Sequence, residues 1–387
     1  MSRIVIFVGI LGLANAYVGW RLAGRLPMAA PLSVLWIVLT GFFFLQLAAP
    51  FGDRLLFPEW RDRFGGERLF TVLDWLSYLA LGILSCLLLY GLLADLMGLM
   101  WKWVESRPLS VDFNRRALIT LGLATAGTAI VGVSQALAKP EVVAVDIPLR
   151  NLPPEFDGFR MVQISDLHAG PIIGRAYVET VVAKAMSANP DLIVLTGDFV
   201  DGEAQQLRDD LAPLGQLSAP HGLFFIPGNH EYYWGLDEWL EEFRALGATP
   251  LMNEHRVVER GDGRLVLAGI TDLAARRFEG VLQPDVDQAL GGAPSDVPRI
   301  LLAHQPNSYV LAEGKGIDLQ LSGHTHAGQY FPFTLLIGLF HRYYKGLNRH
   351  GDMWIYVNRG TGFWGPPMRT GNPSEITVLT LRSETAG

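Results

Sequence analysis

Four long runs without a charged residue occupy the first third of this chain. They span residues Ile4–Trp20, Leu26–Gly52, Trp75–Ala94 and Ala117–Ala138. About 20 apolar residues are enough to cross the hydrocarbon core of a bilayer. One such run would suit a buried helix of a large soluble core, but four in succession leave too little polar chain to cover them. The runs therefore predict an all-α transmembrane region of about four membrane helices over residues 1–138.

The charge distribution changes at the same place. Residues 1–138 hold 11 basic and 8 acidic side chains, whereas residues 139–387 hold 20 basic and 30 acidic ones. The second part is thus an acidic domain with a net charge of −10. We expect no nucleic-acid partner, because binding to a long duplex normally needs a basic surface. The single cysteine, Cys86, lies inside the third run, so cysteine usage says nothing about the compartment.

The distribution of basic residues hardly distinguishes on which side of the membrane the second domain lies. Four precede the third run and four precede the fourth, namely Arg54, Arg61, Arg63 and Arg68, then Lys102, Arg107, Arg115 and Arg116. Paired arginines, a small-residue apolar run and then Ala136-Leu137-Ala138 resemble a twin-arginine export signal. An ordinary membrane helix with flanking arginines is the alternative. We expect a multi-pass protein of the cytoplasmic membrane with its second domain outside the cytoplasm, and the cytoplasmic face remains the alternative.

From Pro140 onward the pattern becomes that of an α/β domain. Short apolar, β-branched runs end repeatedly at polar residues: FRMVQIS before Asp166, DLIVLTG before Asp198, GLFFIPG before Asn229, RILLA before His304 and IDLQLSG before His324. Stretches of helical character, such as residues 175–188 and 236–246, lie between them. Strands that alternate with helices predict a layered α/β fold, and such sheets place their sites just past the strand ends.

The residues at these strand ends are metal ligands by type. Asp, Asn and His offer oxygen and imidazole nitrogen without a thiolate, which suits manganese, iron or zinc better than calcium. One ion would not use so many ligands, and two ions would need a bridge, for which a carboxylate is suited. Glycines precede Asp198, Asn229 and His324, where the missing Cβ permits sharp turns. His324 and His326 are one residue apart, so on a strand they would share a face and could reach one partner.

These motifs carry a family resemblance. They read Asp166-Leu-His168, Gly197-Asp198-Phe-Val-Asp201, Gly228-Asn229-His230-Glu231, His304 and Gly323-His324-Thr-His326. The series resembles the complete signature of the calcineurin-like metallophosphoesterases and covers residues from about 158 to 382. The resemblance implies that residues 139–387 form a four-layer α/β sandwich, with two packed mixed sheets flanked by helices. It also implies two divalent metal ions, whose identity stays open among manganese, iron and zinc.

The resemblance also implies a role for each motif residue. Asp166, His168 and His326 would bind the first metal, Asp198 would bridge the two ions, and Asn229, His304 and His324 would bind the second. His230 would stay off the metals and act as a general acid on the departing oxygen. Asp201 or Glu231 would orient His230 from outside the ligand set, and the sequence does not choose between them. The nucleophile would be a hydroxide that bridges the metals.

The wider context narrows the resemblance. This chain is similar to the membrane-anchored bacterial branch of the family in its membrane spans, in the stretches AHQP and GHTHAGQ, and in the closing YVNRGTGFWGPPMR. That branch includes exported phosphodiesterases and UDP-2,3-diacylglucosamine pyrophosphatases of lipid A biosynthesis. We therefore expect a phosphodiesterase or pyrophosphatase acting on a lipid-linked or envelope phosphate compound. A nucleotide phosphoesterase or nuclease-like enzyme is one alternative. A non-catalytic membrane interaction module is another, although an intact ligand set with His230 argues against it.

One apolar segment follows the last candidate ligands directly. It reads YFPFTLLIGLFHRYY over residues 330–344, with Arg342 and Lys345 at its end. One hypothesis is a loop that contacts the bilayer beside the metals through Phe331, Phe333, Leu335 and Leu336. The alternative is a buried hairpin that completes the domain core. Four further histidines have no motif context, and we expect surface or capping roles for them: His221, His255, His341 and His350. Nothing in the sequence predicts an oligomeric state.

Overall fold

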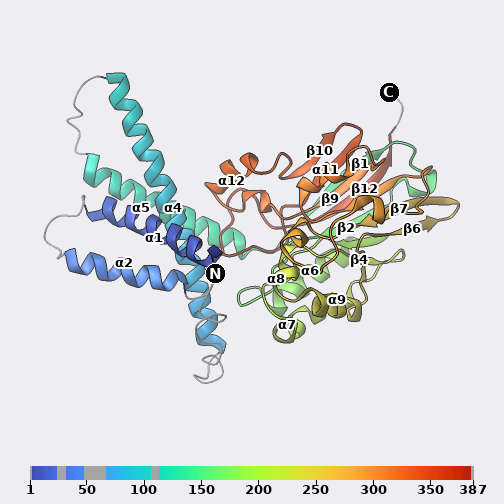
Figure 1. Ribbon diagram of the computed structural model, residues 1–387, viewed down its shortest axis with the longest axis horizontal. Coiled ribbons are helices and arrows are strands. Elements are labelled where there is room, and N and C mark those ends of the chain that lie inside the picture. Colours follow the sequence, from blue (N-terminus) through green and yellow to red (C-terminus); the bar gives the residue numbers. More distant parts are fainter. Residues whose placement is uncertain (1, 24–31, 48–66, 106–112, 385–387) are drawn as a thin grey trace. The chain divides into compact units, whose positions relative to one another are not determined.

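The computed structural model describes residues 2–23, 32–47, 67–105 and 113–384. The chain divides into two compact units, whose elements are labelled in Figure 1. The helical unit comprises residues up to Gln135 together with Gly365–Thr370. The sheet unit comprises Ala136–Trp364 and the residues from Gly371 onward.

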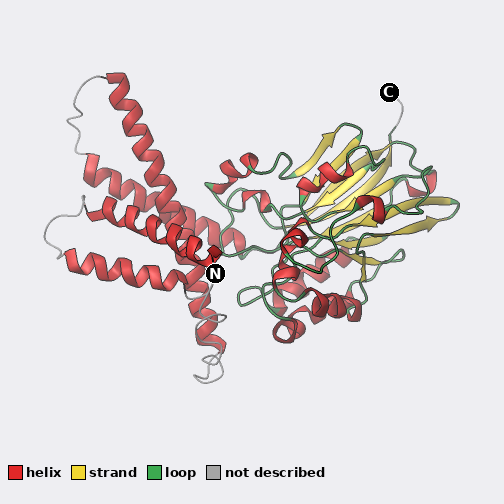
Figure 2. Cartoon of the chain, in the orientation of Figure 1, coloured by secondary structure: helices red, strands yellow, loops and turns green. Residues whose placement is uncertain are grey.

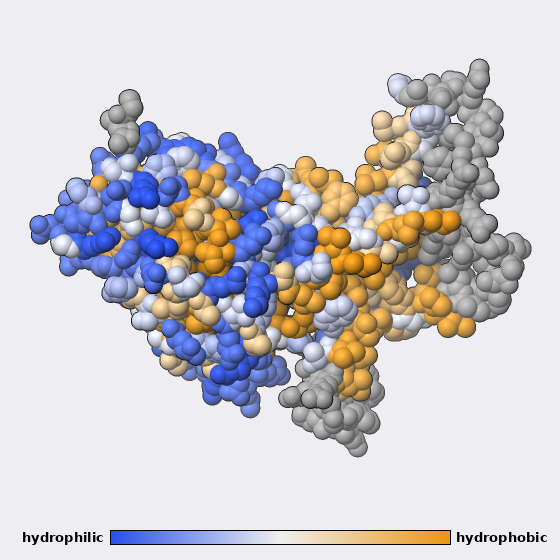
Figure 3. All heavy atoms as spheres, turned by 180° about the vertical axis from the view of Figure 1, so that it is seen from behind, coloured by the Kyte–Doolittle hydropathy of each residue, from blue (hydrophilic) through white to orange (hydrophobic). Residues whose placement is uncertain are grey.

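Each charge-free run of the sequence contains described residues that form a helix of the helical unit. These helices are α1 (Ser2–Ala23), α2 (Leu32–Leu47), α4 (Glu67–Glu105) and α5 (Phe113–Ala136). Apolar side chains make up much of their surface on the face seen in Figure 3. Such an exposed apolar surface is unfavourable in water, and a hydrocarbon environment would remove the cost.

Two of these helices are long and apolar enough to cross a membrane, judged by length and composition. The qualifying stretches are Leu69–Trp101 of α4 and Ile119–Ala136 of α5. The apolar parts described in α1 and α2, Val5–Arg21 and Ile37–Leu47, are shorter. The number of membrane crossings therefore stays a prediction. So does their orientation, and four of the basic residues on which it depends, Arg54, Arg61, Arg63 and Arg107, lie outside the described residues.

Polar side chains connect the first three helices of the helical unit. The Arg21 guanidinium of α1 pairs with the Asp95 carboxylate of α4, and the Tyr17 hydroxyl donates a hydrogen bond to the same carboxylate. The Asn15 amide of α1 donates to the side-chain oxygen of Gln46 in α2 at 2.8 Å. Polar groups that are removed from water need partners. The pairings therefore hold the three helices in one register.

A short stretch late in the sequence belongs to the helical unit. The predicted boundary at residue 138 assigns Gly365–Thr370 to the second domain, whereas in the structure these residues cluster with the helices. The Arg369 amide donates to the Gly132 carbonyl of α5 at 2.8 Å. The buried Met368 fills a space that the glycines Gly82 and Gly132 leave open. Because those contacts lie more than 200 positions apart in the chain, no local pattern signals them.

Two six-stranded mixed sheets form the centre of the sheet unit (Figure 2). In spatial order, the first sheet holds β1 (Glu141–Leu149), β12 (Glu375–Ser383), β2 (Arg160–Ile164), β3 (Leu192–Leu195), β4 (Leu223–Phe225) and β5 (Thr249–Pro250). The second sheet holds β10 (Gly346–His350), β11 (Met353–Val357), β9 (Leu319–Ser322), β8 (Arg299–Leu302), β7 (Gly263–Gly269) and β6 (Glu254–Arg260).

Helices connect or follow these strands. The α-helices are α6 (Arg175–Ser187), α7 (Ala204–Leu211), α8 (Asn229–Tyr233), α9 (Leu236–Ala245), α10 (Val286–Ala289), α11 (Tyr309–Ala312) and α12 (Phe333–Leu336). Short 3-10 turns are η2 (Pro154–Phe156), η3 (Ala212–Gln216), η4 (Leu273–Arg277), η5 (Pro306–Ser308), η6 (His326–Gly328) and η7 (Ile337–Leu339). The helical stretches predicted near residues 175–188 and 236–246 are confirmed as α6 and α9.

Alternation along the strands explains the layers. Met161 of β2 packs into a core shared by both sheets, whereas its neighbour Val162 packs into a second core under α6, α7 and α9. In the second sheet Leu302 faces the shared core, and Leu301 faces a third core with α10 and α11. Successive residues of a strand point to opposite faces of the sheet. The unit is thus helix, sheet, sheet, helix, which confirms the predicted four-layer α/β sandwich.

Candidate metal centre

Every candidate ligand lies just beyond the carboxyl end of a strand. Asp166 and His168 follow β2, Asp198 and Asp201 follow β3, Asn229 and His230 follow β4, His304 follows β8, and His324 and His326 follow β9. The strands β2, β3 and β4 are parallel neighbours, as are β8 and β9. Parallel strands bring their carboxyl ends to one edge of a sheet, which is where open α/β sheets bind ligands. Motifs far apart in the sequence therefore converge there.

The backbone bends sharply at the candidate ligands. Five of them have a positive φ angle, namely Asp166 at 54°, His168 at 52°, Asp198 at 56°, His324 at 70° and His326 at 48°. This left-handed conformation costs about 1–3 kcal/mol for a residue other than glycine and is concentrated at functional sites. The surrounding fold must hold these residues in place. The sequence pattern did not predict this strain.

Glycines at the turns make room for the ligands, as expected from the sequence. A Cβ on Gly323 would lie 2.1 Å from the Oδ2 atom of Asp166. On Gly197, which has a φ of 87°, it would lie 2.8 Å from the Nδ1 atom of His304. These distances are far inside van der Waals contact, so a larger residue would displace a candidate ligand.

Gly228→Ala is expected to destabilise the sheet unit by about 1–3 kcal/mol, in the range of overpacked sites. The added Cβ would lie 2.2 Å from the Oδ1 atom of Asp198 and 2.6 Å from its backbone nitrogen. Chemical unfolding with and without Mn²⁺ would measure the loss. Gly215→Ala is the matched control, because its nearest neighbour there, a methyl of Leu246, is at an ordinary 3.5 Å. Equal stability of the two variants would contradict the crowding.

A first cluster joins Asp166, His168 and His326. The Nε2 atoms of the two histidines are 3.1 Å apart, and the His326 Nε2 atom lies 3.4 Å from the Asp166 Oδ1 atom. All three residues are buried. Asp166 is held by backbone N–H donation from His324 at 2.8 Å and by the Ser165 hydroxyl at 2.5 Å. Ring nitrogens that face each other and a carboxylate can share one cation.

A second cluster joins Asp198, His304 and His324. The His304 Nε2 atom lies 3.0 Å from the Asp198 Oδ2 atom. The other ring nitrogen of His304 lies 2.8 Å from the Thr196 carbonyl oxygen, which fixes Nδ1 as the donor and leaves Nε2 for a ligand role. His324 and His326 thus belong to different clusters, which is the division that the resemblance implies.

Buried polar atoms of His324, in the second cluster, and of Asn229, at the start of α8, fit a cation. The Asn229 Oδ1 atom and the His324 Nδ1 atom are both removed from solvent without a hydrogen-bond partner. Such atoms are costly unless something satisfies them. An amide oxygen, an imidazole nitrogen and a carboxylate together form an ordinary donor set for a divalent transition metal. The residues present at both clusters therefore suit metal ions.

Asp201 contacts two histidines of the centre. Its Oδ1 atom lies 2.5 Å from the His230 Nδ1 atom and 3.3 Å from the His168 Nδ1 atom. The opposite nitrogen of His230, Nε2, lies 3.9 Å from the Asp198 Oδ2 atom. Asp201 thus orients the His230 ring toward the centre and holds a ligand of the first cluster. The three form a further group with metal-ligand spacing.

Glu231 makes different contacts. Its buried carboxylate accepts backbone N–H groups from Phe199 at 2.7 Å, Gly228 at 2.7 Å and Asp198 at 3.0 Å. Glu231 therefore ties the loop after β3 to the start of α8. Between the two residues left open by the sequence, Asp201 is the one that contacts His230.

Charges within the centre shift several pKa values. Burial lowers the pKa of His230, but Asp198 and Asp201 outweigh it and raise the value to about 9. Burial raises the pKa of Asp201, but His168 and His230 bring it down to about 2. The pKa of Glu231 is about 7, because burial and the Asp198 charge both raise it. The carboxylates of Asp198 and Asp201 thus favour the protonated imidazole of His230, the form that can donate a proton.

Asp198 and His304 act on each other in the same way. Burial raises the pKa of Asp198, but the His304 imidazole lowers it well below its usual range. Burial lowers the pKa of His304, but the Asp198 carboxylate raises it well above its usual range. Imidazole binds metals in its neutral form, so a cation shared by the pair would take the place of the proton.

One histidine without motif context lies beside the centre. The His341 ring centroid is 5.5 Å from that of His324, and its Nδ1 atom is buried without a partner. The surface or capping role expected for His341 is wrong. The other three have contacts elsewhere: His221 packs on Phe159, His255 Nδ1 lies 2.8 Å from the Ala289 carbonyl oxygen, and His350 Nδ1 lies 3.0 Å from the Tyr343 hydroxyl. No local motif distinguishes His341 from these.

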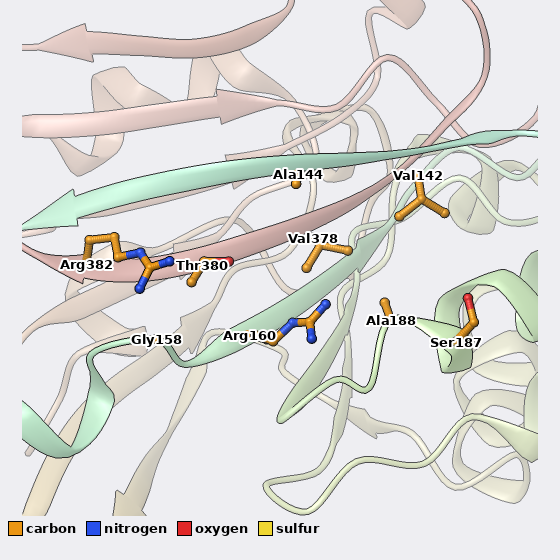
Figure 4. Close-up of a pocket in the computed structure, with 9 residues that line it drawn as sticks. All are labelled: Val142, Ala144, Gly158, Arg160, Ser187, Ala188, Val378, Thr380 and Arg382. Carbon is orange, nitrogen blue, oxygen red and sulfur yellow. The ribbon is translucent and has the colours of Figure 1, made fainter.

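A hollow of about 550 Å³ lies on the outer face of the first sheet, away from the candidate ligands. Figure 4 shows Arg160 of β2 and Arg382 of β12 along it, with Val378 and Thr380. Arg382 pairs with Asp146 at 3.2 Å. None of the candidate ligands lines this hollow.

Comparison with known proteins agrees with the geometry. Residues 159–328 match the family model described as calcineurin-like phosphoesterase. A zebrafish (Danio rerio) protein named transmembrane protein with metallophosphoesterase domain is 38% identical over 323 residues, which cover 80% of this chain and 74% of that protein. A Campylobacter jejuni protein named uncharacterised metallophosphoesterase is 30% identical over 381 residues, which cover 97% and 96%. A Helicobacter pylori protein of the same description is 39% identical over 252 residues, covering 65% and 66%.

Proposed function

This chain belongs to the calcineurin-like phosphoesterase family and is a metal-dependent hydrolase of phosphoester bonds, and we propose that its substrate is a lipid-linked phosphodiester or pyrophosphate. The family uses two divalent metal ions, for which the His/Asp clusters are suited. The observation that carries the proposal is the pair of clusters at one sheet edge, with His230 beside them. The identity of the metals, manganese, iron or zinc, is left to experiment.

The candidate ligands and His230 would have different roles in the reaction. When bound, two cations would neutralise the phosphate oxygens and supply a hydroxide nucleophile at neutral pH. Asp166, His168 and His326 would hold the first ion, and Asn229, His304 and His324 the second, with Asp198 as the bridge. His230 would donate a proton to the departing oxygen through Nε2, because Asp201 engages its other nitrogen.

The helical unit supports a lipid-linked substrate and a location in the cytoplasmic membrane. An enzyme held at a bilayer meets amphiphilic phosphates at high local concentration. UDP-2,3-diacylglucosamine is one compound of this kind, with a pyrophosphate between a nucleoside and an acylated sugar. We propose a multi-pass anchor with the sheet unit outside the cytoplasm. A reporter fused to the C-terminus would test the orientation, and activity of a cytoplasm-specific reporter would overturn it.

Removing one histidine from each cluster is expected to empty different sites. His326→Ala should cost the ion of the first cluster and His324→Ala the ion of the second, since each removes one member of a buried ligand set. Metal analysis of the purified protein would measure the loss. Adding His168→Ala to His326→Ala should remove little more metal, whereas combining His326→Ala with His324→Ala should remove both ions. Equal losses in the two double variants would contradict the division.

Comparing substrates tests the reaction class. The full chain in detergent, supplied with Mn²⁺, would be assayed on an artificial chromogenic phosphodiester, on a phosphomonoester and on UDP-2,3-diacylglucosamine. We expect hydrolysis of the diester and the lipid pyrophosphate, and abolition of both by a chelator. Activity confined to the phosphomonoester would overturn the proposed substrate class while leaving the family chemistry intact.

A further inference from the structure

An exposed apolar segment follows the candidate ligands His324 and His326, which come after β9. It comprises Phe333–Phe340, formed by α12, η7 and the next residue. Three of its large side chains are mostly exposed: Leu335 at 66%, Leu339 at 78% and Phe340 at 72%. Neither short helix has a buried residue, so the segment does not form the buried hairpin that the sequence left open. Contiguous exposed apolar side chains of this size mark an interaction surface.

The charges around the segment fit a lipid surface. No acidic residue occurs from Tyr330 to Lys345, although the sheet unit as a whole is acidic. Arg342 and Lys345 follow the segment and are exposed. Their cationic groups lie over the rings of Tyr343 and Tyr344, at 5.4 and 5.9 Å from the ring centres. Apolar side chains bordered by basic and aromatic residues are typical of elements that lie in the headgroup region of a bilayer.

The residues on the carboxyl side of the segment contact the candidate metal centre. His341 follows it directly, and its ring lies against that of His324 in the second cluster. The Thr325 hydroxyl, between His324 and His326, donates to the Tyr344 carbonyl at 2.6 Å. A surface that contacts the segment would therefore lie next to the candidate ligands.

A candidate membrane helix leads into the same edge of the sheet. Three backbone hydrogen bonds connect the start of β1 with the candidate ligand Asp166. The Glu141 amide donates to the Ser374 carbonyl, and the next residue, Glu375, donates to the Gly360 carbonyl. The Thr361 amide donates to the carbonyl of Ser165, which precedes Asp166. The last residue of α5, Ala136, lies in the core of the sheet unit with Val162 and Ile164. The five steps from Ala136 to Glu141 span at most about 18 Å of extended chain. The chain that leaves α5 therefore enters the sheet unit at the edge that carries the candidate ligands.

We propose that Phe333–Phe340 inserts into the lipid surface and that this docking delivers a lipid-linked phosphate to the second cluster. The delivery step rests on the proposed function, whereas the docking does not. Leu335, Leu339 and Phe340 enter the headgroup region, Arg342 and Lys345 contact anionic headgroups, and His341 lines the path from the lipid surface to His324.

The docking is tested with an environment-sensitive fluorophore on the full chain. The background is Cys86→Ala, which removes the buried cysteine of α4, and the label is attached at Leu339→Cys. The protein is placed in vesicles of phosphatidylethanolamine and phosphatidylglycerol that contain a spin-labelled quenching lipid. We expect a blue-shifted emission and strong quenching by the lipid. The matched control is Val257→Cys on β6 at the far edge of the second sheet, where we expect neither.

A label at Leu339 that is not quenched by lipid overturns the docking. This includes a label that is shielded from water but unquenched, which would mean that protein, for example a second copy of the chain, covers the segment. Quenching at both positions would also overturn it, because it would not be specific to the segment.

The delivery step is tested by Leu339→Glu, with Val257→Glu as control. We expect at least a tenfold loss of turnover on UDP-2,3-diacylglucosamine in vesicles, unchanged turnover of a water-soluble chromogenic diester, and an unchanged unfolding temperature. Full turnover of the lipid substrate by Leu339→Glu overturns the delivery. The unmodified chain could hydrolyse the soluble diester and not the lipid substrate, while the label at position 339 is quenched by lipid. That result would contradict the proposed substrate and would still support the docking.

Discussion

Asp198→Asn is expected to lower phosphodiester turnover by about 10³-fold, since metal-ion charge stabilisation contributes several kcal/mol and each 1.36 kcal/mol is a factor of ten. The carboxylate lies 3.0 Å from the His304 Nε2 atom, and its other oxygen accepts the His230 backbone N–H at 2.8 Å. Asparagine keeps the size of the side chain and tolerates the left-handed backbone at this position. The substitution therefore tests the charge of the proposed bridge and leaves its shape in place.

Steady-state kinetics together with metal analysis would measure this effect. The loss of turnover should be accompanied by loss of metal, which excess Mn²⁺ restores only in part. Asp262→Asn, in the exposed turn between β6 and β7, is the matched control and should behave like the unmodified chain. Normal turnover and metal content in Asp198→Asn would contradict the bridging role.

His230→Ala is expected to lower turnover by about 10²- to 10⁴-fold, the usual contribution of a general acid. The physical reason is the position of the ring, since its Nε2 atom faces the centre at 3.9 Å from Asp198 while Nδ1 is engaged by Asp201. Both metals should stay bound, because the two candidate ligand sets do not include His230. Turnover and metal content measured on the same preparation would separate the two effects.

Substrates with different leaving groups sharpen the test of His230. A leaving group of low pKa needs little help from an acid, so the loss in His230→Ala should be smallest for a nitrophenyl ester and largest for an alkyl ester. Loss of metal in proportion to activity would show that His230 is a ligand instead. Asp201→Asn gives a matched comparison, since it leaves the His230 ring present but removes the carboxylate that orients it.

The fold and the chemistry were largely predictable from local patterns. Apolar runs that end at Asp166, Asp198 and Asn229 indicated strands of a layered α/β fold, and those strands are β2, β3 and β4. Glycines before the ligands indicated tight turns, and the distances at Gly228 and Gly323 explain why no larger residue fits. Strand and turn patterns are readable because each depends on a few adjacent residues.

Other features depend on contacts that no local pattern records. His341 lies in an apolar stretch without a motif, and only its packing against His324 places it at the centre. Asp201 and Glu231 are both acidic residues near His230, yet one contacts the imidazole and the other is engaged by three backbone N–H groups. Within the apolar segment, Leu339 and Phe340 are more exposed than the Phe331 and Leu336 suggested by the sequence.

Residue types and their order thus indicated a two-part chain, a layered α/β domain and a set of candidate oxygen and nitrogen ligands, because apolar periodicity and ligand chemistry are local properties. Whether His324 and His326 reach the same partner could be decided only from the tertiary structure. Both have left-handed backbone, His324 just after β9 and His326 at the start of η6, so they do not alternate as on a strand. One ring turns to His304, which follows β8, and the other to His168, which follows β2 of the other sheet. Only the packing of the two sheets brings those partners within reach.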